Sequence, residues 1–244
     1  MESAGYWSKP RSRGRPARVV VRPPLYGRAM VSTVAALVFP GRCPGCGAAA
    51  EPICPSCAAT AKGAPALSVP IGLDALYVPF AYDGVVRELV ARAKYRDRHA
   101  AFEWLAAEMV RSFGPRGEEV DVVTWAPTTA KRRRMRGFDQ AELLATRIGA
   151  AIHCPVRARL QRKAGAAQTG ANRAARQDRP EFVPRFPSPR HPTSIRRAEK
   201  PFGLLTILLV DDVVTTGATM RAAARALHTV DGIRVIGTAA ARRP

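Results

Sequence analysis

The stretch ILLVDDVVTTGATM, residues Ile207–Met220, joins an apolar block to two adjacent aspartates, a run of threonines and a glycine. The apolar block predicts a buried strand, and the residues after Gly217 predict the start of a helix. In open parallel sheets, ligands lie beyond the carboxyl ends of the strands, where the following helix presents free amide N–H groups. We therefore expect a binding site on this stretch.

The residue types of this stretch indicate which ligand it binds. Its threonines and glycine suit a phosphate, because glycine allows the backbone to approach closely and hydroxyls add hydrogen-bond donors. Asp211 and Asp212 repel phosphate but accept hydrogen bonds from the vicinal hydroxyls of a sugar. A ribose 5-phosphate satisfies both halves of the motif; the alternative is that the two aspartates are ordinary helix-initiating acids. The predicted phosphate cradle consists of Thr215, Thr216, Gly217, Ala218 and Thr219.

The rest of the chain from Asp74 onward alternates strand-like and helix-like patterns. This alternation is typical of an α/β fold with a mostly parallel sheet flanked by helices. Asp139 is expected to cap the third of the helices before the binding motif. Strands are expected at residues 75–82, 120–127, 204–210 and 233–240, and helices at residues 84–97, around 102–109, at 139–152 and from 217 onward.

The chain is strongly basic, with 39 lysines and arginines against 19 aspartates and glutamates, a net charge of +20. Such a charge favours anionic partners such as nucleic acid, polyphosphate or nucleotide, although a codon bias toward arginine is an alternative cause. Residues 1–29 hold seven of the cations with only Glu2 opposing them. We expect a disordered basic tail there, or an upstream extension if Met30 is the true start, in preference to a DNA-binding arm.

A short apolar run, VSTVAALVF, follows at Val31–Phe39. A basic leader before an apolar run resembles a signal peptide, but no A-x-A cleavage site follows, and Arg42 directly before Cys43 argues against lipoprotein cleavage. The run is also far shorter than the roughly 20 residues of a membrane span. We expect a short helix packed on the body of a cytoplasmic protein with no membrane insertion.

Four cysteines form the clearest metal signal in the sequence, CPGCGAAAEPICPSC. Two C-x2-C pairs allow four thiolates to surround one tetrahedral zinc ion, and such a closed site is structural. The alternative is two disulfides, which a cytosolic chain does not favour. Cys154 stands apart and is expected to be a packing residue. The predicted zinc ligands are Cys43, Cys46, Cys54 and Cys57.

The binding motif resembles the phosphoribosyl pyrophosphate (PRPP) loop of type I phosphoribosyltransferases. Four further features precede it in the order of the ComF family, phosphoribosyltransferase-like proteins linked to DNA uptake in competent bacteria. These are the four-cysteine knuckle and the stretches KYRDR (94–98), RRMRGFDQAELLA (133–145) and QTGANRAARQDRPEF (168–182). The likeness covers roughly residues 39–240. It implies PRPP with Mg²⁺ as ligand or substrate, single-stranded DNA and a competence helicase as partners, and asparagine where Asp139 and Asp178 stand.

The resemblance also suggests which cations meet the diphosphate of PRPP. The loop APTTAKRRRMRG resembles the family's pyrophosphate loop, so Arg136, with Gly137, is expected at the leaving group. Lys94 and Arg176 are further candidates for diphosphate or nucleic-acid phosphates. A solvated basic turn at residues 132–134 is the alternative interpretation. In such transferases the ribose C1 passes through an oxocarbenium-like state, and positioning and electrostatics carry the catalysis.

No motif marks a site for an acceptor base. In phosphoribosyltransferases this site comes from a hood element, and here we expect the cysteine knuckle and the N-terminal strands in its place. Tyr77, Tyr82 and Tyr95 are candidates to stack on a base, although a tyrosine in a small α/β protein is more often a core or boundary residue.

Three functions from different classes follow from these features. The chain is a PRPP-dependent transferase, a DNA-uptake accessory that uses PRPP as a ligand or not at all, or a protein adaptor on a degenerate fold, against which the intact PRPP loop argues. The expected divisions are the tail at 1–29, a short helix and zinc knuckle at 30–70, and a phosphoribosyltransferase-like domain at 71–244 with a Pro/Arg-rich insertion at about 183–202.

Overall fold

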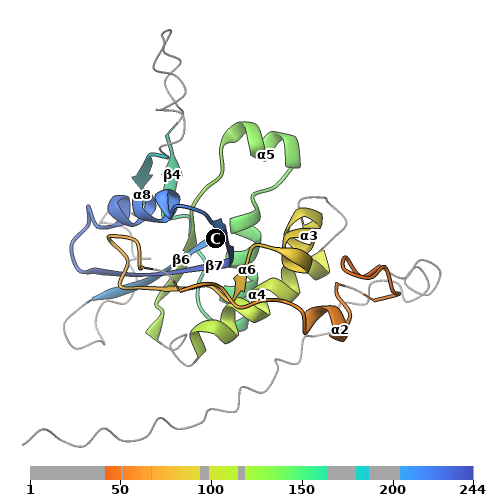
Figure 1. Cartoon of the computed structure of the whole chain (residues 1–244). Helices are drawn as coiled ribbons and strands as arrows, with labels where there is room; N and C mark the ends of the chain where they lie inside the picture. The colour runs from red at the N-terminus through yellow and green to blue at the C-terminus, as the bar shows by residue number, and fades with distance from the viewer. Residues whose placement is uncertain are drawn as a thin grey trace, which may run out of the picture.

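A computed structural model describes residues 42–50, 52–66, 68–93, 99–114, 119–163, 180–186 and 204–243 (Figure 1). The predictions for the basic tail at 1–29, the helix at 31–39 and the KYRDR stretch with Lys94 and Tyr95 lie outside these residues. So do the predictions for Arg176 and Asp178, and most of those for the insertion.

A sheet of five strands forms the centre of the fold, and every neighbouring pair in it is parallel. Its order is β1-β7-β6-β3, with β2 also paired to β7, so the predicted mostly parallel sheet is confirmed. The strands are β1 (Ala75–Tyr77), β2 (Phe80–Ala81), β3 (Val122–Trp125), β6 (Leu205–Val214) and β7 (Ile233–Arg242).

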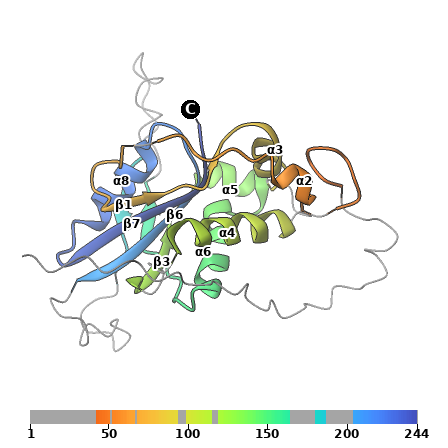
Figure 2. The same cartoon turned by 60° about the horizontal axis from the view of Figure 1, so that its bottom comes forward.

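Helices cover both faces of this sheet (Figures 1 and 2). On β6, Leu208 and Val210 pack in the cluster with α3, α4 and α6, whereas Ile207 and Leu209 pack in the cluster with α8. Because both faces of the strand are buried, its sequence is continuously apolar instead of alternating. The helices are α3 (Gly84–Arg92), α4 (His99–Phe113), α6 (Gln140–Ala151) and α8 (Ala218–Leu227).

Strand β6 is longer than its sequence predicts. We expected it to end at Val210, but it pairs with β7 as far as Val214 opposite Arg242. The reason is that β7 extends from Ile233 to Arg242, so its backbone groups are available to pair with β6 beyond the apolar run. Asp211 and Asp212 therefore lie within the strand and not in the turn after it.

The strand expected at 75–82 consists of two short strands, β1 and β2, which both extend the central sheet by pairing with β7. One further prediction is wrong. The basic stretch after β3 is not a loop but helix α5 (Ala130–Arg136), which Thr129 caps by accepting a hydrogen bond from the N–H of Arg132 at 3.2 Å. Gly137 ends this helix with a φ of 80°.

A small antiparallel pair of strands, which the sequence did not predict, stands beside α8. It consists of β4 (Leu160–Arg162) and β5 (Phe182–Pro184). The expected insertion from 183 onward therefore begins inside a strand, and residues 187–203 lie outside the described ranges. Leu160 and Phe182 are buried in the same cluster as α8, which holds the pair against the body.

Candidate functional site

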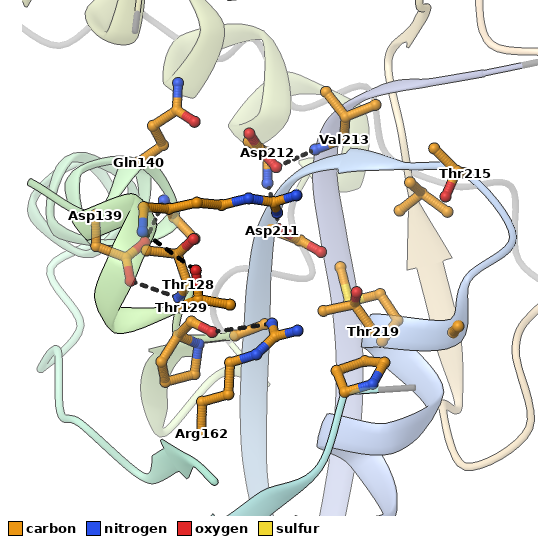
Figure 3. Close-up of a pocket in the computed structure, with 18 of the residues that line it drawn as sticks. Thr128, Thr129, Asp139, Gln140, Arg162, Asp211, Asp212, Val213, Thr215 and Thr219 are labelled. Carbon is orange, nitrogen blue, oxygen red and sulfur yellow. Dashed lines mark hydrogen bonds between the residues drawn. The ribbon is translucent and has the colours of Figure 1, made fainter. Parts of the chain in front are cut away.

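A pocket of about 660 Å³ opens at the carboxyl ends of β3 and β6 (Figure 3). Strand β3 is followed by α6 on one face of the sheet, and β6 is followed by α8 on the other. The segments that follow these two strands therefore run to opposite faces of the sheet. A ligand in an open parallel sheet usually lies at such a position. Strand β3 accompanies β6 only to Val210, so Asp211 and the residues after it face the pocket without a neighbouring strand on that side.

The two adjacent aspartates of the binding motif both line this pocket. Oδ1 of Asp211 accepts a hydrogen bond from the N–H of Asp212 at 2.9 Å, and Oδ1 of Asp212 accepts one from the N–H of Val213 at 2.8 Å. Burial raises the pKa of Asp211 well above its usual value, and the charge of Asp212 raises it further. The pair therefore favours hydroxyl donors or a cation as its partner.

The predicted phosphate cradle forms the turn into α8 and lines the same pocket. Gly217 is the N-cap of the helix with a φ of 71°, and a Cβ there would lie 3.0 Å from Cγ of Pro70. The N-cap residue has no side chain to cap the helix, and the N–H of Ala218 donates only a long hydrogen bond of 3.4 Å to Oγ1 of Thr216, so further amide N–H groups of the first turn are available. Those groups, the positive end of the helix dipole and the hydroxyls of Thr215 and Thr219 suit an anion.

The wall opposite the cradle is built around Asp139, which is 3% exposed. Its Oδ2 accepts from the N–H of Thr128 at 2.8 Å and its Oδ1 from the N–H of Ala141 at 3.1 Å, so it caps α6 as predicted. Burial raises the pKa of Asp139, although these N–H groups act against the shift. An asparagine has only one oxygen and cannot accept both bonds, which gives a structural reason for the acid at this position.

Four arginines line the pocket, and the sequence pointed clearly to only one of them, Arg136. Arg136 donates to Oε1 of Gln140, while Nε2 of Gln140 is buried without a hydrogen-bond partner. Arg162 from β4 and Arg243 after β7 were not predicted, because neither follows a recognisable motif. The four are Arg132, Arg136, Arg162 and Arg243.

The remaining cations and aromatic residues divide between the pocket and other places. Arg132, Arg133 and Arg134 are all exposed, and Arg133 forms an ion pair of 3.4 Å with Glu142, so the solvated interpretation fits this stretch; Arg132 also lines the pocket. Tyr77 packs against Phe113 with ring centroids 6.1 Å apart. The ring of Tyr82, in contrast, lines the pocket with the guanidinium of Arg243 5.3 Å from its centroid.

The four cysteines of the knuckle converge as predicted and are free of disulfides. Their sulfur atoms all lie within 4.8 Å of one another, and those of Cys46 and Cys54 are 3.7 Å apart. A tetrahedral ion with Zn–S bonds of about 2.3 Å separates its sulfurs by about 3.8 Å. A Cβ at Gly45 would lie 2.6 Å from Sγ of Cys57, so glycine is required for this approach. The four residues are therefore positioned to bind a metal ion.

The protonation of these thiols is uneven. The N–H of Cys54, which donates to Sγ of Cys43 at 3.5 Å, lowers the pKa of Cys43 to about 6, although burial opposes the shift. Hydrogen bonds with the side chains of Cys43 and Cys54 raise the pKa of Cys57 to about 12. The thiol of Cys43 thus forms a thiolate readily, whereas that of Cys57 needs a cation to replace its proton.

Two further predictions concern the membrane and Cys154. The residues described by the structure contain no helix that is both long and apolar enough to span a membrane. Cys154 lies outside the metal cluster and donates a hydrogen bond to the carbonyl of Val120 at 3.5 Å, in agreement with the packing role expected for it.

Comparison with known proteins supports the interpretation of the pocket. Residues 143–244 match the family model described as the phosphoribosyl transferase domain. A search of curated proteins found no match. The matched region contains β6, α8 and β7, and with them the acidic pair and the phosphate cradle. The mostly parallel sheet with flanking helices, expected from the sequence for a type I phosphoribosyltransferase-like fold, is confirmed, and residues 143–244 are similar to the phosphoribosyl transferase domain.

Proposed function

We propose that the pocket binds PRPP together with Mg²⁺. Asp211 and Asp212 accept hydrogen bonds from the ribose hydroxyls, and the 5-phosphate lies in the cradle at the start of α8. The diphosphate then faces the opposite wall, where Arg136 contacts it, with Lys94 as a further contact. The observation that carries this proposal is one pocket with an acidic pair and a helix N-terminus on one side and arginines on the other.

The residues present also suit the magnesium ion. Each aspartate of the pair uses one oxygen to accept the N–H of the next residue, which leaves the second oxygen for a ligand. Mg²⁺ is commonly held by one or two carboxylates together with substrate phosphates. When bound, the ion neutralises charge that develops on the departing diphosphate.

The reaction that suits this ligand is transfer of phosphoribose to a nucleophilic acceptor. The bond from the ribose C1 to the diphosphate oxygen breaks, and its electron pair leaves with the diphosphate. A lone pair of the acceptor forms the new bond to C1, and the acceptor's proton passes to solvent. The protein holds the reacting groups in place and stabilises the leaving charge with Arg136. Tyr82, which lines the pocket, is the candidate to stack on a planar base or amine.

The biological role that we propose is that of the ComF type, in which a PRPP-binding protein assists uptake or processing of single-stranded DNA beside a helicase in the cytoplasm. Helix α5 supports it, since this helix exposes four cations, of which Arg132 lines the pocket and three lie outside its lining. The three outside the lining are Lys131, Arg133 and Arg134. Each phosphate that such a surface neutralises releases counterions, so DNA binding must weaken steeply with salt.

The test of PRPP binding and turnover is pyrophosphate release from PRPP and Mg²⁺ by the full chain, across a panel of nucleobases, amines and single-stranded DNA. Release that depends on one acceptor and is lost in Asp211→Asn/Asp212→Asn makes the protein a transferase. Tight PRPP binding without release supports the accessory role. Absence of PRPP binding to the folded protein refutes the proposal.

The DNA role is tested separately by single-stranded DNA affinity as a function of salt. The triple variant Lys131→Ala/Arg133→Ala/Arg134→Ala is expected to weaken binding and to reduce the slope by up to about three phosphates. The matched control removes three exposed cations from other elements, for which Arg87, Arg185 and Arg225 are suitable. Equal losses in both triple variants contradict a DNA surface on α5.

A further inference from the structure

Arg162 is a half-buried arginine that reaches the pocket from an element outside the central sheet. It is the last residue of β4, and it lines the pocket beside residues of β6 and α8. Figure 3 shows its side chain between the turn at Thr128 and Thr129 on one side and Thr219 on the other. Arg162 therefore lies where the two walls of the pocket come together.

The guanidinium of Arg162 has few partners of its own. Nη1 donates to the carbonyl of Pro127 at 3.5 Å, which is at the long limit of a hydrogen bond, and within the described residues Arg162 forms no ion pair. A guanidinium has five N–H donors, so most of them remain available. A half-buried cation with unused donors is costly unless an anion joins it.

The charges around Arg162 favour an anionic ligand. Burial lowers the pKa of Arg162, and the charge of Arg132 lowers it further, while Asp211 and Asp139 act in the opposite direction. Two arginines close enough to disfavour each other's charge are stabilised by a multiply charged anion between them. Asp139 accepts backbone N–H groups with both of its oxygens and Asp211 with one, and within the described residues neither forms an ion pair with Arg162.

The position of Arg162 is held by the second strand of the pair. Its guanidinium carbon lies 5.6 Å from the ring centroid of Phe182, which is buried against α8. Stacking on this ring orients the planar group and limits its rotamers. The side chain is therefore fixed toward the pocket before any ligand arrives.

We propose that Arg162 is a binding residue for the diphosphate of the ligand, forming with Arg132 and Arg136 the anion site opposite the phosphate cradle. This inference rests on the proposed function and assigns a further residue to it. The diphosphate is favoured over the 5-phosphate because Arg162 is hydrogen-bonded to the Pro127 turn, on the same wall as α5. Arg162 thus brings β4 into the site and links the antiparallel pair to ligand binding.

The experiment measures binding of pyrophosphate with Mg²⁺ and of ribose 5-phosphate by calorimetry, on the full chain. Arg162→Met keeps an apolar stem against Phe182 and removes the donors. We expect pyrophosphate affinity to fall about 10- to 100-fold, the usual loss when charge-assisted hydrogen bonds are removed. Ribose 5-phosphate affinity is expected to change little. Arg162→Lys keeps the charge without the planar fork and should restore affinity only in part.

Arg185→Met is the matched control, because Arg185 follows β5, is exposed and donates to Gln161 at 3.1 Å outside the pocket. Equal losses of pyrophosphate binding in the Arg162 and Arg185 variants, or an unchanged affinity in folded Arg162→Met, overturn the inference alone. A larger loss for ribose 5-phosphate than for pyrophosphate also overturns it. A wild-type protein that binds neither PRPP nor these fragments refutes the proposed function as well.

Discussion

Replacing Asp211 with asparagine is expected to weaken ligand binding and to stabilise the free protein. Asp211 is held in the pocket beside Asp212, and burial followed by the neighbouring charge raises its pKa. Asparagine has nearly the same shape, and its oxygen still accepts from the N–H of Asp212. The substitution therefore removes the charge with little change of packing.

The sign of the stability effect follows from proton linkage. A carboxyl whose pKa is raised by folding ionises more readily in the unfolded chain than in the folded one. Its ionisation therefore destabilises the folded state above the unfolded pKa of about 3.9. The penalty is complete above the folded pKa and disappears as the pH falls toward the unfolded value. Asp211→Asn must therefore be more stable than wild type at neutral pH, with a difference that shrinks in acid.

The binding effect has the opposite sign. Of the two oxygens of Asp211, one is occupied by the backbone and one is free for a ribose hydroxyl or the magnesium ion. Losing one hydrogen bond to a charged acceptor costs about 1.5–3 kcal/mol, or roughly 10- to 150-fold in affinity for PRPP. Improved stability with lost binding is the pattern of a residue kept for function.

The assay is urea unfolding at about pH 8 and at about pH 4.5. At about pH 8 the penalty from Asp211 is largest, whereas at about pH 4.5 it is smaller because this pH is close to the unfolded pKa of about 3.9. PRPP binding is measured by calorimetry on the same preparations. Asp231→Asn, at an exposed position outside the pocket, is the matched control and should change neither quantity. An Asp211→Asn protein that is less stable at pH 8, or that binds PRPP as tightly as wild type, refutes the reasoning.

Three further predictions concern packing, metal and the wall opposite the cradle. Gly149→Ala should lower the free energy of unfolding by about 1–3 kcal/mol, despite the better helix propensity of alanine, because its Cβ would lie 2.3 Å from Cγ2 of Val156; urea titration checks this. Metal analysis should find one ion per chain in wild type and in Cys154→Ser, but a strongly reduced content in Cys46→Ser, and equal retention in both variants contradicts a four-cysteine site. Asp139→Asn should cost about 1–3 kcal/mol by thermal unfolding, because only one of its two accepted backbone bonds survives; an unchanged midpoint would show that the second bond is unimportant.

The elements of the fold were largely predictable because their signals are local. The helical spacing before Arg92, the apolar blocks at β3, β6 and β7, and the cap at Asp139 each occupy a few consecutive residues. The two-stranded pair was missed because each of its strands has only three residues. The end of β6 was missed because its length depends on the partner strand and not on its own apolar run.

The candidate site was predictable on one side and not on the other. The acidic pair and the phosphate cradle are contiguous, so their residue types alone indicate sugar and phosphate. Arg162, Arg243 and Tyr82 carry no such signal, since each is one common residue in an unremarkable context. They reach the pocket only because β2, β4 and β7 end near it.

The sequence by itself determined what a short stretch of chain encodes: the four-cysteine cluster, the acidic pair with the threonine-rich turn, and the alternation that specifies a parallel sheet. Only the tertiary structure decided which cations oppose the cradle, because pairing of β3 with β6 brings residues as distant as Trp125 and Val210 side by side. The physical reason is that secondary structure follows from neighbours along the chain, whereas a binding wall follows from which buried faces pack together. The net positive charge favours an anionic partner, and the fold brings together the residues that we propose to bind it.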